Sequence, residues 1–293
     1  MMEIDGNTKI FGVFGDPISH TLSPFMHNAA FRYLKLNCIY LPFWVEEGLL
    51  GDALRGIAGL NIQGVNLTIP HKTEAMKYLD EMDEETNLIK AVNTIKIEKG
   101  KLKGYNTDGR GILISLRKDC GFNPKDKNVL IIGAGGSARA VAIRLALHKA
   151  RKIIIANRTR QKAREIVEDI IRNTDCNAIN IPLEENSLVN EAGNIHLLIN
   201  TTSIGMNPSD FRLVKEKFFE RAAKLRLVYD LIYSPAQTKL LKDAKRYHIK
   251  AFNGLGMLLY QGALSLEIWT GKRAPIHIMK NALYKAAKSE KWR

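Results

Sequence analysis

The chain has 293 residues, 45% of them hydrophobic and 25% charged, an ordinary globular composition that allows two buried cores. The net charge is +14, but the basic excess is scattered outside the stretch from Lys272 to Arg293, and no aromatic-interleaved basic run predicts nucleic-acid binding. Residues 1–9 are polar and no apolar run reaches about 18 residues, so we expect a cytoplasmic protein without a membrane span.

Short β-rich runs alternate with helical segments, a pattern typical of βαβ units that predicts an α/β fold. In the first part of the chain we expect strands over residues 9–14, 38–43 and 65–69 and helices over 24–34, 47–57 and 71–79. Residues 92–103 alternate in polarity around Lys99-Gly100, which predicts a hairpin.

A second strand series follows, with expected strands over residues 129–132, 152–156, 178–181, 197–200 and 227–231. Two helices, over residues 255–269 and 275–288, close the chain without a strand after them. The three cysteines, Cys38, Cys120 and Cys176, form no CxxC pair and have no neighbouring His cluster, so we predict neither a disulfide framework nor a metal site.

The strongest local motif is VLIIGAGGSARA, residues 129–140. An apolar strand runs into glycines and then into a helix, which permits a tight turn and close approach of a pyrophosphate to the helix N-terminus. A bare structural turn is the alternative. The residues of this expected dinucleotide site are Gly133, Ala134, Gly135, Gly136, Ser137 and Ala138.

The end of the next strand decides between NAD and NADP. NAD-binding folds place an acid there for the ribose 2′-hydroxyl, whereas this chain has Asn157, Arg158, Thr159 and Lys162. The cations could form a solvated helix start. However, cations in a first helical turn oppose the helix dipole, so a bound phosphate is the better account, and we predict NADP.

The first part of the chain carries a second set of polar residues. Thr21 and Ser23 precede Pro24, and Ser23 could simply be a helix N-cap. Asn66 and Thr68 share one face of an expected strand, and Lys72, in the helix start beyond, could be an ordinary surface lysine.

Two further motifs have equally plain alternatives. AVNT, residues 91–94 with Asn93, could be an ordinary strand. In GYNTDGRG, residues 104–111, Asp108 could cap the following helix.

The combination weakens these separate alternatives. Nine motifs, in one order over residues 10–285, resemble those of the shikimate dehydrogenase family, although relatives acting on quinate share most of them. They are TLSP, NLTIPHK, AVNT, NTD, GAGGSARA, NRT, NTTSIGM, DLIYSPAQT and NGLGMLLYQGALSLEIWTG.

The resemblance implies roles for individual residues. Lys72 and Asp108 would be the catalytic acid/base pair. Thr21, Ser23 and Tyr233 would hold the substrate carboxylate, and Asn66, Thr68, Asn93, Asp108 and Gln261 its ring hydroxyls. The cofactor would also contact Thr201, Thr202 and Ser203, with Met206, Gly254 and Met257 bordering the nicotinamide.

This chain departs from the family pattern at two positions. The family usually has serine where Thr21 stands and often arginine where Lys162 stands. Both changes keep the polar or charged group, so they bear on selectivity more than on activity.

The implied reaction is reversible NADP-dependent oxidoreduction between shikimate and 3-dehydroshikimate, in the precursor pathway of the aromatic amino acids. We expect a substrate domain over residues 1–108 and 255–293, and a doubly wound, Rossmann-type NADP domain over 109–254, with the active site in a cleft between them. We expect a monomer or homodimer that binds no metal, nucleic acid or membrane. Rival hypotheses are a quinate or quinate/shikimate dehydrogenase, a non-catalytic NADP sensor and a basic nucleic-acid binder.

Overall fold

The computed structural model describes residues 4–207 and 209–289, so both ends of the predicted substrate domain, and the last part of the basic stretch after Lys272, lie outside the described residues. The chain divides into two compact units. Unit 1 contains Met1–Gly111 and Leu258–Trp292, and unit 2 contains Ile112–Met257. The chain leaves unit 1 within α4 (Asp108–Lys118) and returns within α10 (Leu255–Thr270).

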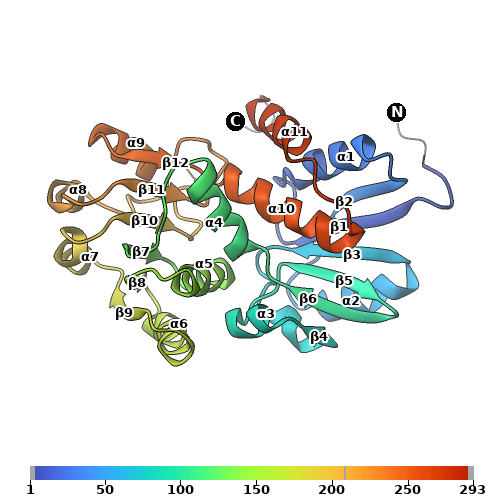
Figure 1. Ribbon diagram of the computed structural model, residues 1–293, viewed down its shortest axis with the longest axis horizontal. Coiled ribbons are helices and arrows are strands. Elements are labelled where there is room, and N and C mark those ends of the chain that lie inside the picture. The colour runs from blue at the N-terminus through green and yellow to red at the C-terminus, as the bar shows by residue number, and fades with distance from the viewer. Residues whose placement is uncertain (1–3, 208, 290–293) are drawn as a thin grey trace. The chain divides into compact units, whose positions relative to one another are not determined.

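Unit 1 is built on a mixed six-stranded sheet of order β2-β1-β3-β5-β6-β4. Phe14, Val65 and Leu67 face one side, where they form a core with Leu54 and Ile57 of α2. On the other side, Phe11 and Tyr40 contact Trp269 of α10, on the face that carries α1 and α11 (Figure 1). The strands are β1 (Lys9–Gly15), β2 (Cys38–Trp44), β3 (Ile62–Leu67), β4 (Glu81–Met82), β5 (Thr94–Glu98) and β6 (Lys101–Tyr105), and the helices are α1 (Ser23–Tyr33), α2 (Leu50–Gly59), η1 (Glu74–Tyr78), α3 (Glu84–Ile89) and α11 (Ile276–Lys288).

The predicted hairpin is present as β5 and β6. Glu98 pairs with Lys101, so the loop is Lys99-Gly100, and both loop residues have positive φ, 52° and 78°. Two successive left-handed residues make the turn whose twist matches that of antiparallel strands.

Two local predictions for unit 1 were wrong, and one alternative interpretation is excluded. The helix expected over residues 71–79 is reduced to a short 3₁₀ helix, η1 (Glu74–Tyr78), because the Lys72 carbonyl accepts the Val92 N–H (2.7 Å) instead of a helical one. The strand expected over residues 65–69 ends at Leu67, so Thr68 lies just beyond it. Ser23 is inside α1 and does not cap it: the N-cap is Leu22, without a side-chain cap bond, and the Ser23 N–H donates to Thr21 Oγ1 (3.3 Å).

Unit 2 is built on a fully parallel six-stranded sheet of order β12-β11-β10-β7-β8-β9. From β7 the chain runs outward through β8 to β9, and then crosses to β10 and continues through β11 to β12, so the strand order reverses between β7 and β10. The strands are β7 (Asn128–Ile132), β8 (Lys152–Asn157), β9 (Asn177–Pro182), β10 (Leu197–Asn200), β11 (Leu227–Asp230) and β12 (Lys250–Phe252).

Helices cover both faces of this sheet (Figure 1). On one face α7, α8 and α9 supply Leu188, Phe218 and Leu241 to a core with Leu130 and Ile154 of the strands, while α5 and α6 lie on the other. The helices are α5 (Gly136–Leu147), α6 (Arg160–Asn173), α7 (Glu185–Ala192), α8 (Glu216–Arg221) and α9 (Lys239–Arg246). The predicted α/β class, with a doubly wound second part and closing helices, is confirmed, although the short strands β4 and β12 were missed.

Across residues 4–207 and 209–289, no helix is long and apolar enough to span a bilayer. Cys38, Cys120 and Cys176 are buried and unpaired with one another. In the same described residues, no three His, Cys, Asp or Glu side chains gather as metal ligands would.

Candidate functional site

Lys72 and Asp108, the predicted catalytic pair, meet in unit 1. Lys72 Nζ donates to Asp108 Oδ2 at 2.6 Å, and the two side chains are 14% and 4% exposed. Lys72 lies in the turn after β3, and Asp108 is the first residue of α4, where a carboxylate is favoured by the helix dipole. The pair is therefore a largely desolvated ion pair in which a small part of the lysine side chain is still exposed.

Asn93 holds the other side of this carboxylate. Its Nδ2 donates to Asp108 Oδ1 (2.8 Å) and to Gln261 Oε1 (3.2 Å). Its Oδ1 accepts the backbone N–H of Thr107 (2.8 Å), and because a backbone N–H can only donate, this bond fixes which end of the amide faces Asp108. Asn93 is 1% exposed, so its orientation is set by these bonds.

Gln261 reaches the group from α10. A Cβ built on Gly111 would lie 2.8 Å from the Gln261 backbone nitrogen, so the start of α4 approaches α10 as closely as it does only because residue 111 is glycine. The Gln261 Nε2 donates to the Leu258 carbonyl (2.9 Å), which leaves Oε1 for Asn93.

Thr21, Ser23 and Thr68 lie beyond the carboxyl ends of β1 and β3. These two strands are neighbours and parallel, so the three residues follow the same edge of the sheet as Lys72 does. Gly15 makes room for Thr68, since a Cβ there would lie 2.4 Å from Thr68 Cγ2. Tyr233 follows β11 in unit 2, and its predicted place beside Thr21 and Ser23 stays a prediction.

The predicted cofactor residues of unit 2 all follow strand ends at the carboxyl edge of its parallel sheet. Gly133 to Ala138 follow β7, Asn157 ends β8 with Arg158 to Lys162 after it, and Thr201 to Met206 follow β10. Strand order reverses between β7 and β10, which is where doubly wound sheets bind their ligands.

The glycine loop has the geometry expected of a pyrophosphate site. Gly133 has φ of 112°, and a Cβ there would lie 2.3 Å from Thr201 Oγ1, which itself donates to the Ile132 carbonyl (2.7 Å). A Cβ on Gly135 would meet no atom within 4 Å, so the space before α5 is open. Gly135 is the N-cap of α5 and Ala138 is fully buried, so the helix N-terminus points at that space with a close-packed turn behind it.

Three cations surround the start of α6. Arg158 precedes the helix, and Arg160 and Lys162 lie in its first turn, which contains no acid. All three are exposed, and within the described part of the chain none of them has an ion-pair partner. Arg158 lies before the helix, since Thr159 is the N-cap, and Arg160, which sequence analysis missed, lies in the first turn.

The loop after β10 rests on a buried polar group that sequence analysis also missed. Asn200 Oδ1 accepts the Thr202 hydroxyl (2.7 Å), and its Nδ2 donates to Asp230 Oδ1 (3.0 Å). Thr238, which caps α9, donates to Asp230 Oδ2 (2.7 Å). Burial raises the pKa of Asp230 to about 6, although the bonds from Thr238, the Ile232 N–H and Asn200 act in the opposite direction.

The start of α10 is held by close backbone packing. A Cβ on Gly254 would lie 2.0 Å from the Leu231 carbonyl oxygen, so glycine is required there by the chain itself. The Met257 N–H donates to the hydroxyl of buried Tyr229 (3.0 Å). Packing thus explains Gly254 whether or not a nicotinamide lies beside it.

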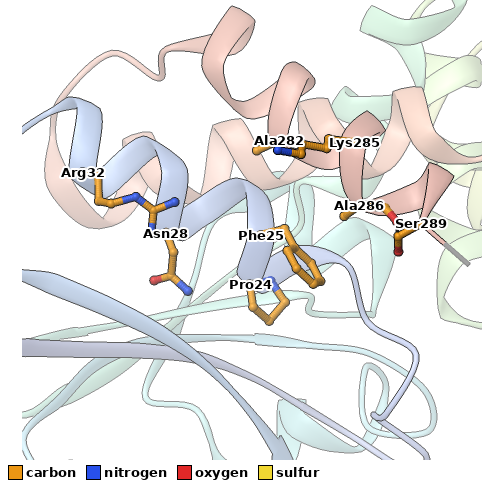
Figure 2. Close-up of a pocket in the computed structure, with 8 residues that line it drawn as sticks. All are labelled: Pro24, Phe25, Asn28, Arg32, Ala282, Lys285, Ala286 and Ser289. Carbon is orange, nitrogen blue, oxygen red and sulfur yellow. Dashed lines mark hydrogen bonds between the residues drawn. The ribbon is translucent and has the colours of Figure 1, made fainter. Parts of the chain in front are cut away.

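A separate pocket of about 530 Å³ lies in unit 1 between α1 and α11 (Figure 2). It contains none of the predicted site residues. Its lining is Pro24, Phe25, Asn28, Arg32, Ala282, Lys285, Ala286 and Ser289.

Comparison with known proteins gives the family. Residues 13–95 match the shikimate dehydrogenase substrate binding domain, residues 116–232 match the shikimate/quinate 5-dehydrogenase domain, and residues 254–284 match the shikimate 5′-dehydrogenase C-terminal domain. The NADP⁺-dependent shikimate dehydrogenase of Desulforamulus reducens is 47% identical over 282 residues, 96% of this chain and 97% of that one. The chain belongs to the shikimate dehydrogenase family.

Solved structures agree with this membership. A shikimate dehydrogenase in complex with NADP⁺ has 44% identity and a TM-score of 0.86 over 98% of both chains. The shikimate 5-dehydrogenase from Listeria monocytogenes, in complex with shikimate and NAD, has 37% identity and a TM-score of 0.87 over 97% of this chain and 99% of that one. The predicted family is therefore confirmed, and so is the fold that the family resemblance implied.

Proposed function

We propose that this chain is an NADP-dependent shikimate dehydrogenase, which interconverts shikimate and 3-dehydroshikimate. The observation that carries the proposal is the buried Lys72–Asp108 pair, oriented by Asn93 and bordered by Gln261. The names and ligands of relatives at 37–47% identity over nearly the whole chain support it.

Unit 1 supplies the substrate site in this proposal. The substrate carboxylate is bound by Thr21 and Ser23, with Tyr233 added from unit 2. The ring hydroxyls are bound by Thr68, Asn93, Asp108 and Gln261. The Ser23 result favours this role, because the hydroxyl is not used as a helix cap. We assign the substrate domain to residues 1–108 and 255–293.

The NADP domain, which we assign to residues 109–254, supplies the cofactor site together with Met257. The open space before α5 fits a pyrophosphate, and the acid-free start of α6 with Arg158 and Lys162 fits a 2′-phosphate. When bound, NADP supplies the hydride acceptor or donor. Thr201, Thr202, Ser203 and Met206 border the same strand ends.

The protein's own chemistry is proton transfer and orientation. When shikimate is oxidised, the hydroxyl proton must leave as hydride leaves carbon. In this direction the amine form of Lys72 accepts that proton at Nζ, and in the reverse direction the Lys72 ammonium returns it to the substrate oxygen. Asp108 holds the ammonium by one carboxylate oxygen while Asn93 holds the other oxygen, so the lysine stays aimed at one position.

Quinate is the second candidate substrate, since the domain that matches residues 116–232 is named for both. Quinate carries one more hydroxyl at a tetrahedral carbon beside its carboxylate, and Thr21 has a methyl group where the family usually has serine. We expect kcat/KM to favour shikimate by about 10²-fold, because sites seldom reject one added hydroxyl more strongly.

The test is absorbance at 340 nm with NADP⁺ or NAD⁺ and shikimate or quinate. Reduction of NADP⁺ by shikimate is the expected result. No reduction with either substrate would overturn the proposal, and equal use of quinate would establish the second candidate. A cytoplasmic location and a monomeric or homodimeric state belong to the same proposal.

A further inference from the structure

Asn66 lies on the face of β3 that packs against α10, and it is 6% exposed. Its side-chain amide makes four hydrogen bonds inside the protein. Nδ2 donates to the Asn93 carbonyl, to Thr94 Oγ1 and to Ser265 Oγ, each at 3.0 Å, and Oδ1 accepts the Tyr40 hydroxyl at 2.8 Å.

An amide nitrogen has two hydrogens, and three acceptors already compete for those of Asn66. No N–H is left for a ligand. The family resemblance suggested that Asn66 holds a ring hydroxyl, whereas both of its amide hydrogens are engaged by neighbours and Oδ1 already accepts the Tyr40 hydroxyl.

Tyr40 fixes the direction of this amide. The Asn93 carbonyl can only accept, so the atom facing it is Nδ2, and Oδ1 must then face Tyr40, whose hydroxyl donates. Tyr40 is fully buried, and its ring stacks on buried His27 with centroids 4.3 Å apart and planes 5° apart. The donor is therefore held rigidly.

The partners of Asn66 lead to the substrate-binding groups. Thr94 Oγ1 donates to Asn93 Oδ1 (3.0 Å), and Ser265 Oγ donates to the Gln261 carbonyl (3.0 Å) one turn earlier on α10. Asn66 thus connects β3 to Asn93, which contacts Asp108, and to the helix that carries Gln261.

We propose that Asn66 is a positioning residue that acts through Asn93 and Gln261, with its direction set by Tyr40, and that it donates no hydrogen bond to substrate. The inference rests on the proposed function, because the groups it positions are the proposed ligands of shikimate. Ser265 has the matching role on α10.

The first experiment compares steady-state kinetics of Tyr40→Phe, Asn66→Ala and the double variant. Tyr40→Phe lowers kcat/KM for shikimate about 3- to 10-fold, mostly through KM, and changes KM for NADP⁺ by less than about 2-fold. In the Asn66→Ala background the same change costs less than about 2-fold, since the residue it orients is gone. Independent, multiplying effects would overturn the proposal. Tyr33→Phe, at a half-exposed tyrosine of α1, is the control and leaves both constants unchanged.

Shikimate analogues that each lack one ring hydroxyl separate positioning from direct contact. If Asn66 is a positioning residue, Asn66→Ala lowers kcat/KM by the same factor with shikimate and with every analogue. If the loss disappeared with one analogue, Asn66 would be the ligand of the missing hydroxyl, and the proposal would be wrong.

Ser265→Ala tests the α10 arm. It raises KM for shikimate about 3- to 10-fold, whereas Thr270→Ala, which removes a hydroxyl bonded to Leu266 on the same helix, leaves KM unchanged. If the two variants changed KM for shikimate equally, Ser265 would stabilise α10 without positioning Gln261.

Thermal unfolding without substrate keeps this inference distinct from the proposed function. Tyr40→Phe lowers Tm by about 2–4 °C, and by much less when Asn66 is already alanine. If the unmodified protein did not turn over shikimate, the proposed function and the positioning role would both fail, whereas the Tm coupling would still be seen. If the enzyme is active but the Tm shifts of the two single variants simply add in the double variant, Tyr40 does not orient Asn66 and the positioning proposal is wrong.

Discussion

The polar side chains around Asp108 in unit 1 bond to one another, whereas the cations at the start of α6 in unit 2 are exposed. Asp108, Asn93 and Gln261 are each less than 8% exposed and share hydrogen bonds. Arg158 and Lys162, in contrast, are exposed. A buried, fully bonded group is set before a ligand arrives, whereas an exposed cation gains its partner from the ligand. Substitutions should therefore be coupled in unit 1 and separable in unit 2.

The largest expected effect is in unit 1. Lys72→Ala lowers kcat about 10²- to 10⁴-fold while KM for shikimate changes much less, because a general acid/base acts mainly in the transition state. Steady-state kinetics measure both constants. Lys77→Ala, an exposed lysine of η1, is the control. A loss confined to KM would make Lys72 a binding residue only.

The second effect concerns Asp230, a buried acid in unit 2 that supports the loop after β10 through Asn200. Its pKa of about 6 lies above the ordinary 3.8, so the folded protein holds the proton more tightly than the unfolded chain. The contribution of Asp230 to the free energy of unfolding is then greatest below pH 3.8 and falls as the pH rises to 6, by up to about 3 kcal/mol.

Denaturant unfolding between pH 4 and about 7 measures this contribution. Asp230→Asn removes the titrating proton, so its stability should decline less over that range than that of the unmodified protein. Parallel curves for the two proteins would show that Asp230 does not titrate in this window.

Arg158→Ala addresses the exposed cations. The loss of a charged hydrogen bond reduces affinity for NADP⁺ about 10- to 150-fold and leaves NAD⁺ binding nearly unchanged. Titration calorimetry with each cofactor separates the two. Arg172→Ala, an exposed arginine at the far end of α6, should change neither affinity. Equal use of both cofactors by the unmodified protein would contradict the assignment.

Gly133→Ala and Gly135→Ala give the smallest and sharpest contrast. Gly133 has positive φ and no room for a Cβ, so alanine destabilises the fold by about 1–3 kcal/mol. Gly135 has open space, so alanine should leave Tm unchanged and weaken NADP⁺ binding. Unfolding and cofactor titration of both variants are needed, and a drop in Tm for Gly135→Ala would mean that the space is structural.

Local patterns predicted what depends on neighbours in the chain. The alternation of strands and helices, the Lys99-Gly100 hairpin and the run from β7 through the glycines into α5 were visible, because periodicity and turn chemistry are written over a few residues. The family was recognisable because its motifs occur in one order. The helix expected at residues 71–79 failed for the opposite reason, since a distant N–H, that of Val92, takes the Lys72 carbonyl.

The sequence by itself determined the α/β class, the glycine turn and the absence of an acid before α6, because each is a property of consecutive residues. Only the tertiary structure decided which polar side chains already have partners inside the protein. The Asn66 amide bonds to Tyr40, Asn93, Thr94 and Ser265, whereas Ser23 does not cap its own helix. Hydrogen-bond capacity is filled by whichever groups folding brings within about 3 Å, and those groups lie up to 199 residues apart in the chain.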